Sequence, residues 1–199
     1  QMVAENGFRL NTGFLATPYL LHVLADNGFS ALAFKLLEQE QSPSWLFNVK
    51  AGATTILEDW QVFENCVASF NHYSFGAVCD FLFAGVAGIR PTIEQPGYKH
   101  FLLKPLIGGT LTAAHAMYES LYGPIESAWE RNGDTVNYTF AVPANTTATV
   151  MLQAVEPALE LVKRTHPDAV YENGRIVFSV GSGRWQANGI CMQAGSEGI

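Results

Sequence analysis

The chain has 199 residues, of which 48% are hydrophobic and 15% charged, and this composition excludes a disordered polypeptide. The formal net charge is −7, and no cluster of Lys and Arg could neutralise a row of phosphates, so we expect no nucleic-acid partner. No apolar run reaches the roughly 18 residues of a membrane span, so we expect no membrane partner.

The cysteines are scattered, odd in number and without the CxxC spacing of metal or redox sites. They are Cys66, Cys79 and Cys191. We therefore expect buried free thiols rather than a disulfide or a zinc site. The histidines also lack a metal-ligand spacing, so we expect neither a metal nor another cofactor. The start, "QMVAENGFRL", is not a signal peptide, which leaves the compartment (periplasmic or extracellular, or cytoplasmic) undecided.

The first ninety residues have the apolar spacing of helices. Thr17-Pro18 predicts an N-cap followed by the first helical position, and Asn27-Gly28 predicts the end of that helix. Ser30 is the expected cap of a second helix, which we expect to stop before Ser42-Pro43. A third helix is predicted from about residue 70 to residue 88, with apolar residues on most sides.

The pattern changes after residue 90 from helical spacing to strict alternation. The segment "TVNYTFAV", residues 135–142, places Val136, Tyr138, Phe140 and Val142 on one face. Asn132-Gly133-Asp134 before it, and Asn173-Gly174 further on, are typical of hairpin turns. Several short strands at this spacing favour an antiparallel β-sandwich.

We therefore predict an α+β chain in two parts, with a boundary at the Pro and Gly residues of 90–97. Residues 1–92 supply helices and residues 93–199 the antiparallel β-sandwich. The helices are too few to close a domain by themselves, so we expect them to be one portion of a larger helical assembly.

A connection of roughly thirty residues lies between the second and third predicted helices, longer than the usual 2–8 for a helix pair. Glu58, Asp59 and Trp60 follow one another in it, and His72 lies at its end. A carboxylate can act as acid or base, an indole can face a sugar ring, and an imidazole can bind hydroxyls.

Each of these residues also has a purely structural interpretation. A Glu beside an Asp is usually solvated, and the tryptophans, Trp45 included, are more often core residues than ligand platforms. His72 could satisfy backbone groups at a helix start, where Asn71 is the expected N-cap. Lys50 is expected to be a surface charge or the partner of a nearby acid.

Four segments together resemble the C-terminal part of the bacterial α-L-rhamnosidases. They are "TGFLATPYLLHVLADNG", "SPSWLFNVKAGATTILEDW", "SFNHYSFGAVCDFLFAGVAGI" and "PGYKHFLLKPLIGGTLTAAHAMYESLYGPIESAWE". The resemblance covers roughly residues 6 to 155 in the order of the family. It implies a partial (α/α)6 catalytic barrel followed by a C-terminal β-sandwich, and an inverting glycosidase that acts on terminal α-L-rhamnose.

The resemblance also implies roles for three residues. The general base of the family, the Glu of "TTI-x-E-x-W", falls on Glu58, and the pocket histidine of "FNHY" falls on His72. Trp60 would flank the sugar, and Asp59 would be solvated or supporting. The general acid of the family lies upstream of residue 1, so we expect the isolated chain to be inactive.

Two other interpretations remain open from the sequence. The chain could be a non-catalytic carbohydrate-binding or structural module, or part of another (α/α)6 glycosidase, such as a glucoamylase- or trehalase-like enzyme. The partner that we expect is a carbohydrate, an α-L-rhamnoside substrate. We also expect a homo-oligomer, formed through barrel helices whose apolar faces are exposed.

Overall fold

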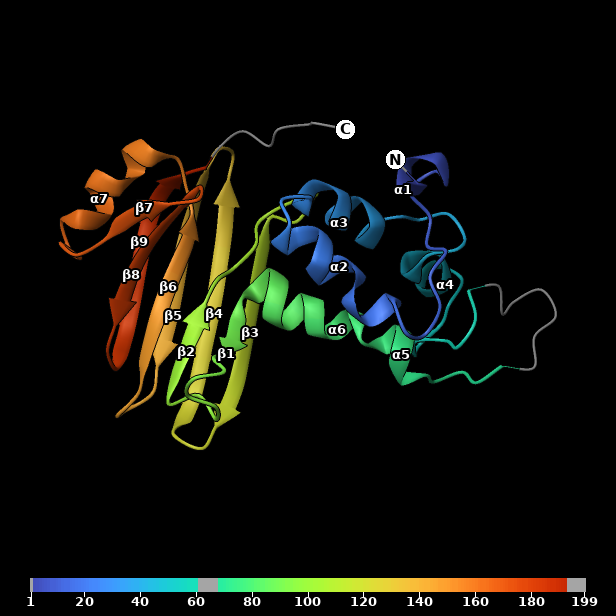
Figure 1. The fold of residues 1–199 in the computed structure, drawn as a ribbon, viewed down its shortest axis with the longest axis horizontal. Helices are drawn as coiled ribbons and strands as arrows, with labels where there is room; N and C mark the ends of the chain where they lie inside the picture. Colours follow the sequence, from blue (N-terminus) through green and yellow to red (C-terminus); the bar gives the residue numbers. More distant parts are fainter. Residues whose placement is uncertain (1, 61–67, 193–199) are drawn as a thin grey trace. The chain divides into compact units, whose positions relative to one another are not determined.

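The computed structural model describes residues 2–60 and 68–192 and divides them into two compact units, one ending at Phe81 and the other starting at Leu82 (Figure 1). The first unit is helical and the second contains all the strands of the described residues. This order agrees with the predicted α+β fold. The predicted domain boundary at residues 90–97 stays a prediction.

The first unit contains six helices among its described residues. They are α1 (Met2–Glu5), α2 (Thr17–Asp26), α3 (Ser30–Leu37), α4 (Trp45–Lys50), α5 (Tyr73–Gly76) and α6 (Val78–Asp80). The helices α2 and α3 form a hairpin that turns at Asn27 and Gly28, as predicted; Gly28 has a φ of 87°. Leu21, Phe34 and Phe81 belong to the core of this unit.

The predicted caps of α2 and α3 were wrong. Thr17 is the first residue of its helix after the N-cap Ala16, and its hydroxyl donates back to the carbonyl of Gly13 at 2.9 Å. Thr17 thus lies inside the first turn and bonds back to the preceding carbonyl instead of taking the N-cap position. Ser30 likewise follows the N-cap Phe29, and no side chain caps that helix.

The third helix differs from the uninterrupted helix predicted over residues 70–88. It begins at Tyr73 after the N-cap His72, not after Asn71, and α6 is followed by η1 (Phe81–Ala87), which is π-helical. In the part of η1 that belongs to the second unit, the carbonyls of Val86 and Ala87 accept from Trp129 Nε1 and Ser127 Oγ. Side chains of the sheet thus cap the end of this helix, and local sequence does not encode such contacts.

The second unit consists of two sheets, which Figure 1 shows as two layers. One sheet has the order β1 (Ile89–Pro91), β2 (His100–Leu103), β6 (Thr147–Gln153), β8 (Arg175–Val180) and β7 (Val170–Glu172). The other has the order β3 (Ala113–Ser120), β4 (Gly123–Asn132), β5 (Thr135–Val142) and β9 (Gly183–Cys191). The short helices η2 (Glu156–Ala158) and α7 (Leu159–Lys163) lie between β6 and β7 in the chain.

The sandwich prediction is confirmed, with one difference. Among the strands of the described residues, every pairing is antiparallel except that of β2 with β6. This pairing is parallel because the chain returns to the sheet by a long connection through the other sheet. Both predicted hairpins are present, between β4 and β5 and between β7 and β8. Asn173 and Gly174 both have positive φ, as a type I′ turn requires.

The alternation predicted for residues 135–142 is also confirmed, since Val136, Tyr138, Phe140 and Val142 are all buried. The Tyr138 hydroxyl donates to the carbonyl of Gln153 at 3.2 Å, which links the two sheets. Burial raises the pKa of the Tyr138 phenol, because the charged phenolate would lose its hydration, although the positive charge of Arg175 opposes this shift.

The prediction of buried thiols was wrong for both described cysteines, because Cys79 and Cys191 are free and exposed. Cys191 ends β9 directly after the buried Ile190, so the alternation of the strand turns the cysteine outwards. Cys66 lies outside the described residues.

Candidate active site

The segment that carries Glu58 follows α4, a helix within the connection that the sequence predicts as a loop. Ser44 caps α4 by accepting from the backbone N–H of Phe47 at 3.1 Å. Trp45, its first residue, is buried, and its indole N–H donates to the carbonyl of Phe75 at 2.9 Å. Trp45 is therefore a core residue that fixes α4 against α5, in agreement with its structural interpretation.

Glu58 and His72 lie on two segments that run side by side. The backbone N–H of Glu58 donates to the carbonyl of Ser69 at 3.0 Å, and that of His72 donates to the carbonyl of Ile56 at 2.9 Å. The hydroxyl of Thr55 also donates to the carbonyl of Phe70. These bonds hold the two motifs of the resemblance, "TTILEDW" and "FNHY", in a constant register.

The Glu58 carboxylate is half-buried, and its Oε2 accepts from the backbone N–H of Ser69 at 2.7 Å. A hydrogen bond to an ionised oxygen is among the stronger kinds, and this one fixes the carboxylate relative to the backbone. Within residues 2–60 and 68–192, no other group donates to this side chain. Its second oxygen is therefore available to a water molecule or a ligand.

A pocket of about 230 Å³ lies beside this carboxylate. Its lining residues are Thr12, Gly13, Phe14, Glu58, Asp59, Trp60 and Phe75. The acidic pair and the indole that follow one another in the sequence therefore contribute to the same pocket. Asp59 is half-buried in it rather than fully solvated.

Trp60 lines the pocket and is also part of an aromatic cluster. Its ring stacks on Phe75, with ring centroids 4.0 Å apart and an angle of 21° between the planes, and it meets Trp45 edge-on at 5.5 Å. The indole nitrogen of Trp60 is buried and has no hydrogen-bond partner among the described residues. The cluster holds the indole in one orientation, so its interpretations as core residue and as pocket wall are compatible.

The imidazole of His72 stacks with two aromatic rings. The ring centroid of Phe14 lies 4.4 Å from that of His72, with 19° between the ring planes. The ring centroid of Tyr73 lies 5.2 Å from that of His72, with 17° between the planes. His72 Nδ1 accepts from the backbone N–H of Ser74 at 3.3 Å. A neutral ring whose Nδ1 accepts must carry its proton on Nε2, so Nε2 can donate to a hydroxyl oxygen.

Phe14 is a site residue that the sequence reasoning missed. It lines the pocket with Glu58, stacks on His72 and contacts Phe75 at 5.1 Å between ring centroids. His72 does not itself line the pocket; Phe14 connects the two. A phenylalanine has no titratable or polar group that marks a site, and only the fold brings Phe14 next to a residue 58 positions later (72 − 14).

The remaining charged candidates lie outside this pocket. Lys50 pairs with Glu40 at 2.5 Å on an exposed surface, as its structural interpretation predicts. His22 Nε2 lies 2.8 Å from a carboxylate oxygen of Asp80. Within residues 2–60 and 68–192, no group of three His, Cys, Asp or Glu residues could hold a metal ion, and no helix has the length and apolarity to cross a bilayer.

Two domain families match successive parts of the chain. Residues 1–86 match the bacterial α-L-rhamnosidase six-hairpin glycosidase domain, and residues 88–166 match the bacterial α-L-rhamnosidase C-terminal domain. Together they cover most of the 199 residues. Their order is the one that the sequence resemblance implies.

Curated relatives agree with these matches. The chain is 38% identical over 190 residues to an α-L-rhamnosidase of Streptomyces avermitilis, a match that covers 92% of this chain and 18% of the relative. It is 36% identical over 157 residues to an α-L-rhamnosidase of Formosa agariphila, covering 75% of this chain and 17% of the relative. The chain thus spans less than a fifth of the length of these relatives.

The fold is also similar to that of a solved α-L-rhamnosidase. The crystal structure of the Streptomyces avermitilis α-L-rhamnosidase in complex with L-rhamnose matches this chain with a TM-score of 0.83 and 36% identity, over 94% of this chain and 19% of that one. Since domain families, relatives and fold agree, the chain belongs to the bacterial α-L-rhamnosidase family, with helices of the six-hairpin glycosidase domain followed by the C-terminal β-sandwich domain.

Proposed function

We propose that this chain is the base-bearing portion of an α-L-rhamnosidase that removes terminal α-L-rhamnose with inversion, with Glu58 as the general base. The observation that carries the proposal is the half-buried Glu58 carboxylate, which is fixed by the Ser69 N–H and lines a pocket walled by Trp60 and Phe14. A carboxylate held in this way can accept a proton from a water molecule in the pocket while that water attacks the anomeric carbon.

In this proposal His72 and Trp60 bind the sugar. The Nε2–H of His72 donates to a rhamnose hydroxyl, and stacking with Phe14 and Tyr73 fixes the orientation of the imidazole. Trp60 presents an indole, braced by Phe75, to the apolar side of the sugar ring. Asp59 supports the pocket with a second negative charge near the base.

The proton donor is supplied by a carboxylic acid outside this chain. An inverting mechanism needs an acid and a base roughly 6.5–9.5 Å apart, so that the attacking water fits between base and substrate. Among residues 2–60 and 68–192, the pocket has one further acid, Asp59, which adjoins Glu58 in sequence and therefore cannot face it across a sugar. We accordingly expect no turnover of an aryl α-L-rhamnoside by the isolated chain.

The test is Glu58→Gln in the full-length enzyme. Loss of a general base should lower kcat by about 10²–10⁴-fold, with folding and sugar binding retained. The matched control is Asp59→Asn, which removes the neighbouring charge and should leave most of the activity. Proton NMR of the first product formed should show the β-anomer. Unchanged kcat in Glu58→Gln, or an α-anomer as first product, would overturn the proposal.

A further inference from the structure

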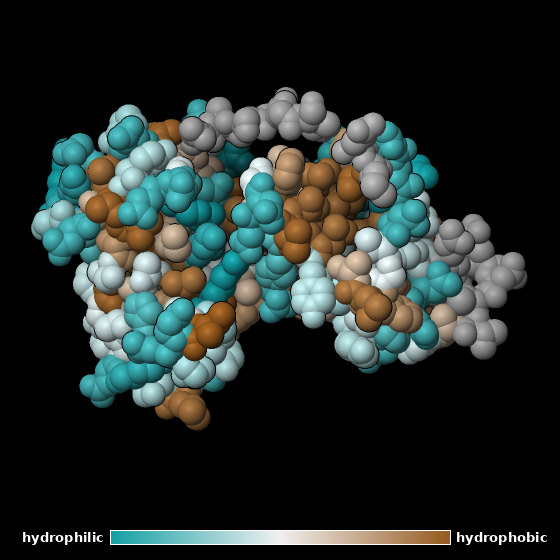
Figure 2. All heavy atoms as spheres, viewed as in Figure 1, coloured by the Kyte–Doolittle hydropathy of each residue, from teal (hydrophilic) through white to brown (hydrophobic). Residues whose placement is uncertain are grey.

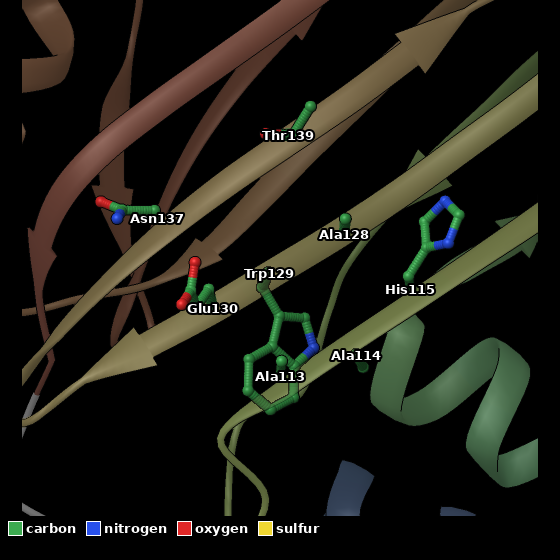
Figure 3. Close-up of a pocket in the computed structure, with 8 residues that line it drawn as sticks. All are labelled: Ala113, Ala114, His115, Ala128, Trp129, Glu130, Asn137 and Thr139. Carbon is green, nitrogen blue, oxygen red and sulfur yellow. The ribbon is translucent and has the colours of Figure 1, made fainter.

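The outer face of the four-stranded sheet in the second unit carries a shallow hollow, which Figure 3 shows in close-up. Its volume is about 450 Å³, within the range of roughly 300–1,000 Å³ that is typical of ligand sites. It is lined by residues of β3, β4 and β5, namely Ala113, Ala114, His115, Ala128, Trp129, Glu130, Asn137 and Thr139. Neither the sequence reasoning nor the proposed function assigns a role to it.

The strand register explains how the hollow forms. His115, Ala128 and Thr139 lie opposite one another in one row across the three strands. Ala113, Glu130 and Asn137 form the next row on the same face, two residues further along. Alanines in both rows leave the floor low, while longer polar side chains stand around it, as Figure 3 shows.

The dimensions of this frame follow from sheet geometry. Neighbouring strands are about 4.8 Å apart and two residues along a strand span about 6.7 Å, so the polar groups border an area of roughly 10 by 7 Å. That area is comparable to a single pyranose ring with its hydroxyl groups. This frame is not visible in the sequence, because its residues come from three strands and alternate with core residues.

The polar groups around the hollow are available for binding. The side-chain oxygen of Asn137 accepts from the backbone N–H of Gly189 at 2.8 Å, which fixes the amide and leaves its NH₂ group as a donor. His115, Glu130 and Thr139 make no hydrogen bond or ion pair with any residue in the described part of the chain. The site therefore offers a fixed donor from Asn137 and a carboxylate acceptor from Glu130. The imidazole of His115 and the hydroxyl of Thr139 can each donate or accept a hydrogen bond.

This set of groups selects one class of ligand. A single carboxylate is too few ligands for a metal ion, and the same carboxylate disfavours an anion. No indole or phenyl face is exposed in the hollow for a planar base, since Trp129 is 2% exposed and points to the core. Sugar hydroxyls both donate and accept, and they suit all four polar groups.

We propose that this hollow is a second saccharide-binding site, which holds one neutral sugar unit of a glycan on the β-sandwich. It does not depend on Glu58 or on the proposed catalytic function. The affinity of one shallow site with a few hydrogen bonds is expected to be on the order of 1 mM.

The test is an amide-resolved NMR titration of the 199-residue chain with methyl α-L-rhamnoside, and separately with methyl α-D-glucoside and inorganic phosphate. At least one of the two sugars should shift the amide signals of Ala128, Glu130 and Thr139, and phosphate should not. Ala128→Ile fills the floor with a residue that strands favour, and it should weaken this binding at least about tenfold. Ala141→Ile is the matched control, because Ala141 lies on β5 between Glu126 and Arg184, outside the hollow, and should leave the shifts unchanged.

Glu130→Gln is a second variant that keeps size and fold, and it should also weaken binding, by about tenfold, because the carboxylate is the strongest acceptor present. Shifts at the amides of Glu58 and His72 report the proposed catalytic pocket and are read separately. The inference is overturned if neither sugar shifts the sheet signals up to its solubility limit, if phosphate shifts them instead, or if Ala128→Ile leaves them unchanged.

Discussion

Replacing Gly88 by alanine should destabilise the second unit far more than the same change at Gly97. The two glycines have nearly equal φ angles, 83° and 84°, so alanine would pay the same backbone cost at both. They differ in their surroundings. A Cβ at Gly88 would lie 2.2 Å from the backbone nitrogen of Pro105, whereas a Cβ at Gly97 would meet no atom within 4 Å.

The expected losses can be worked out from these distances. A left-handed conformation costs an alanine about 1–2 kcal/mol, which is the whole expected effect at Gly97. At Gly88 the Pro105 backbone must also move by more than about 1 Å to reach van der Waals separation, and overpacking of this kind costs about 1–3 kcal/mol. The movement strains the hydrogen bond from the Lys104 N–H to the Gly88 carbonyl, 2.8 Å long and worth about 1 kcal/mol. Gly88→Ala should therefore cost about 3–6 kcal/mol.

Urea unfolding followed by tryptophan fluorescence measures both variants against the parent chain. Trp129 reports the second unit directly, because its indole is buried and donates to Val86 two residues before Gly88. The difference between the two variants isolates the steric overlap from the backbone strain, provided that the slopes against urea are equal. Equal losses of stability at Gly88 and Gly97 would refute this account of the close approach.

Three further predictions concern other parts of the chain. Phe14→Leu should keep an apolar pocket wall but remove the ring stacked on His72, lowering kcat/KM of the full-length enzyme about 2- to 10-fold; a stability loss without a kinetic effect would argue against a positioning role. Burial lowers the pKa of His166, so the folded state favours the neutral imidazole, and the stability present above pH of about 6.5 should be lost as the pH falls below it. Thermal melting at successive pH values should show this loss, with a smaller dependence in His166→Gln. Tyr19 and Val23 on α2 are 67% and 56% exposed, and Figure 2 shows apolar side chains over α2 and α3. We therefore expect the chain to self-associate, and Val23→Lys should weaken this association in sedimentation velocity. A monomer at all concentrations would contradict the prediction.

Much of the candidate site was predictable because two short motifs carry it. Glu58, Asp59 and Trp60 are neighbours in the chain, and His72 directly precedes a helical segment with clear apolar spacing. The pocket that Glu58, Asp59 and Trp60 share was not predictable in the same way. It needs Phe14 and the Thr12-Gly13 backbone, which contain no group that signals chemistry.

The second unit also has features that local sequence predicts and others that it does not. Alternation along residues 135–142 and the Asn173-Gly174 turn are local features, and they predict strands and hairpins because each depends on a few adjacent residues. The parallel pairing of β2 with β6 joins segments more than forty residues apart, and the pattern of neither strand specifies its partner.

Local sequence was enough for the order of helices and strands, for the inward faces of the strands and for the motif that bears Glu58, because propensity, periodicity and turn chemistry act over a few residues. The tertiary structure alone decided which helix ends are capped from the sheet, which ring stacks on His72, and that an alanine floor on β3 and β4 lies between polar groups. These features arise where distant segments pack together, and their energies depend on contacts that no spacing along the chain records.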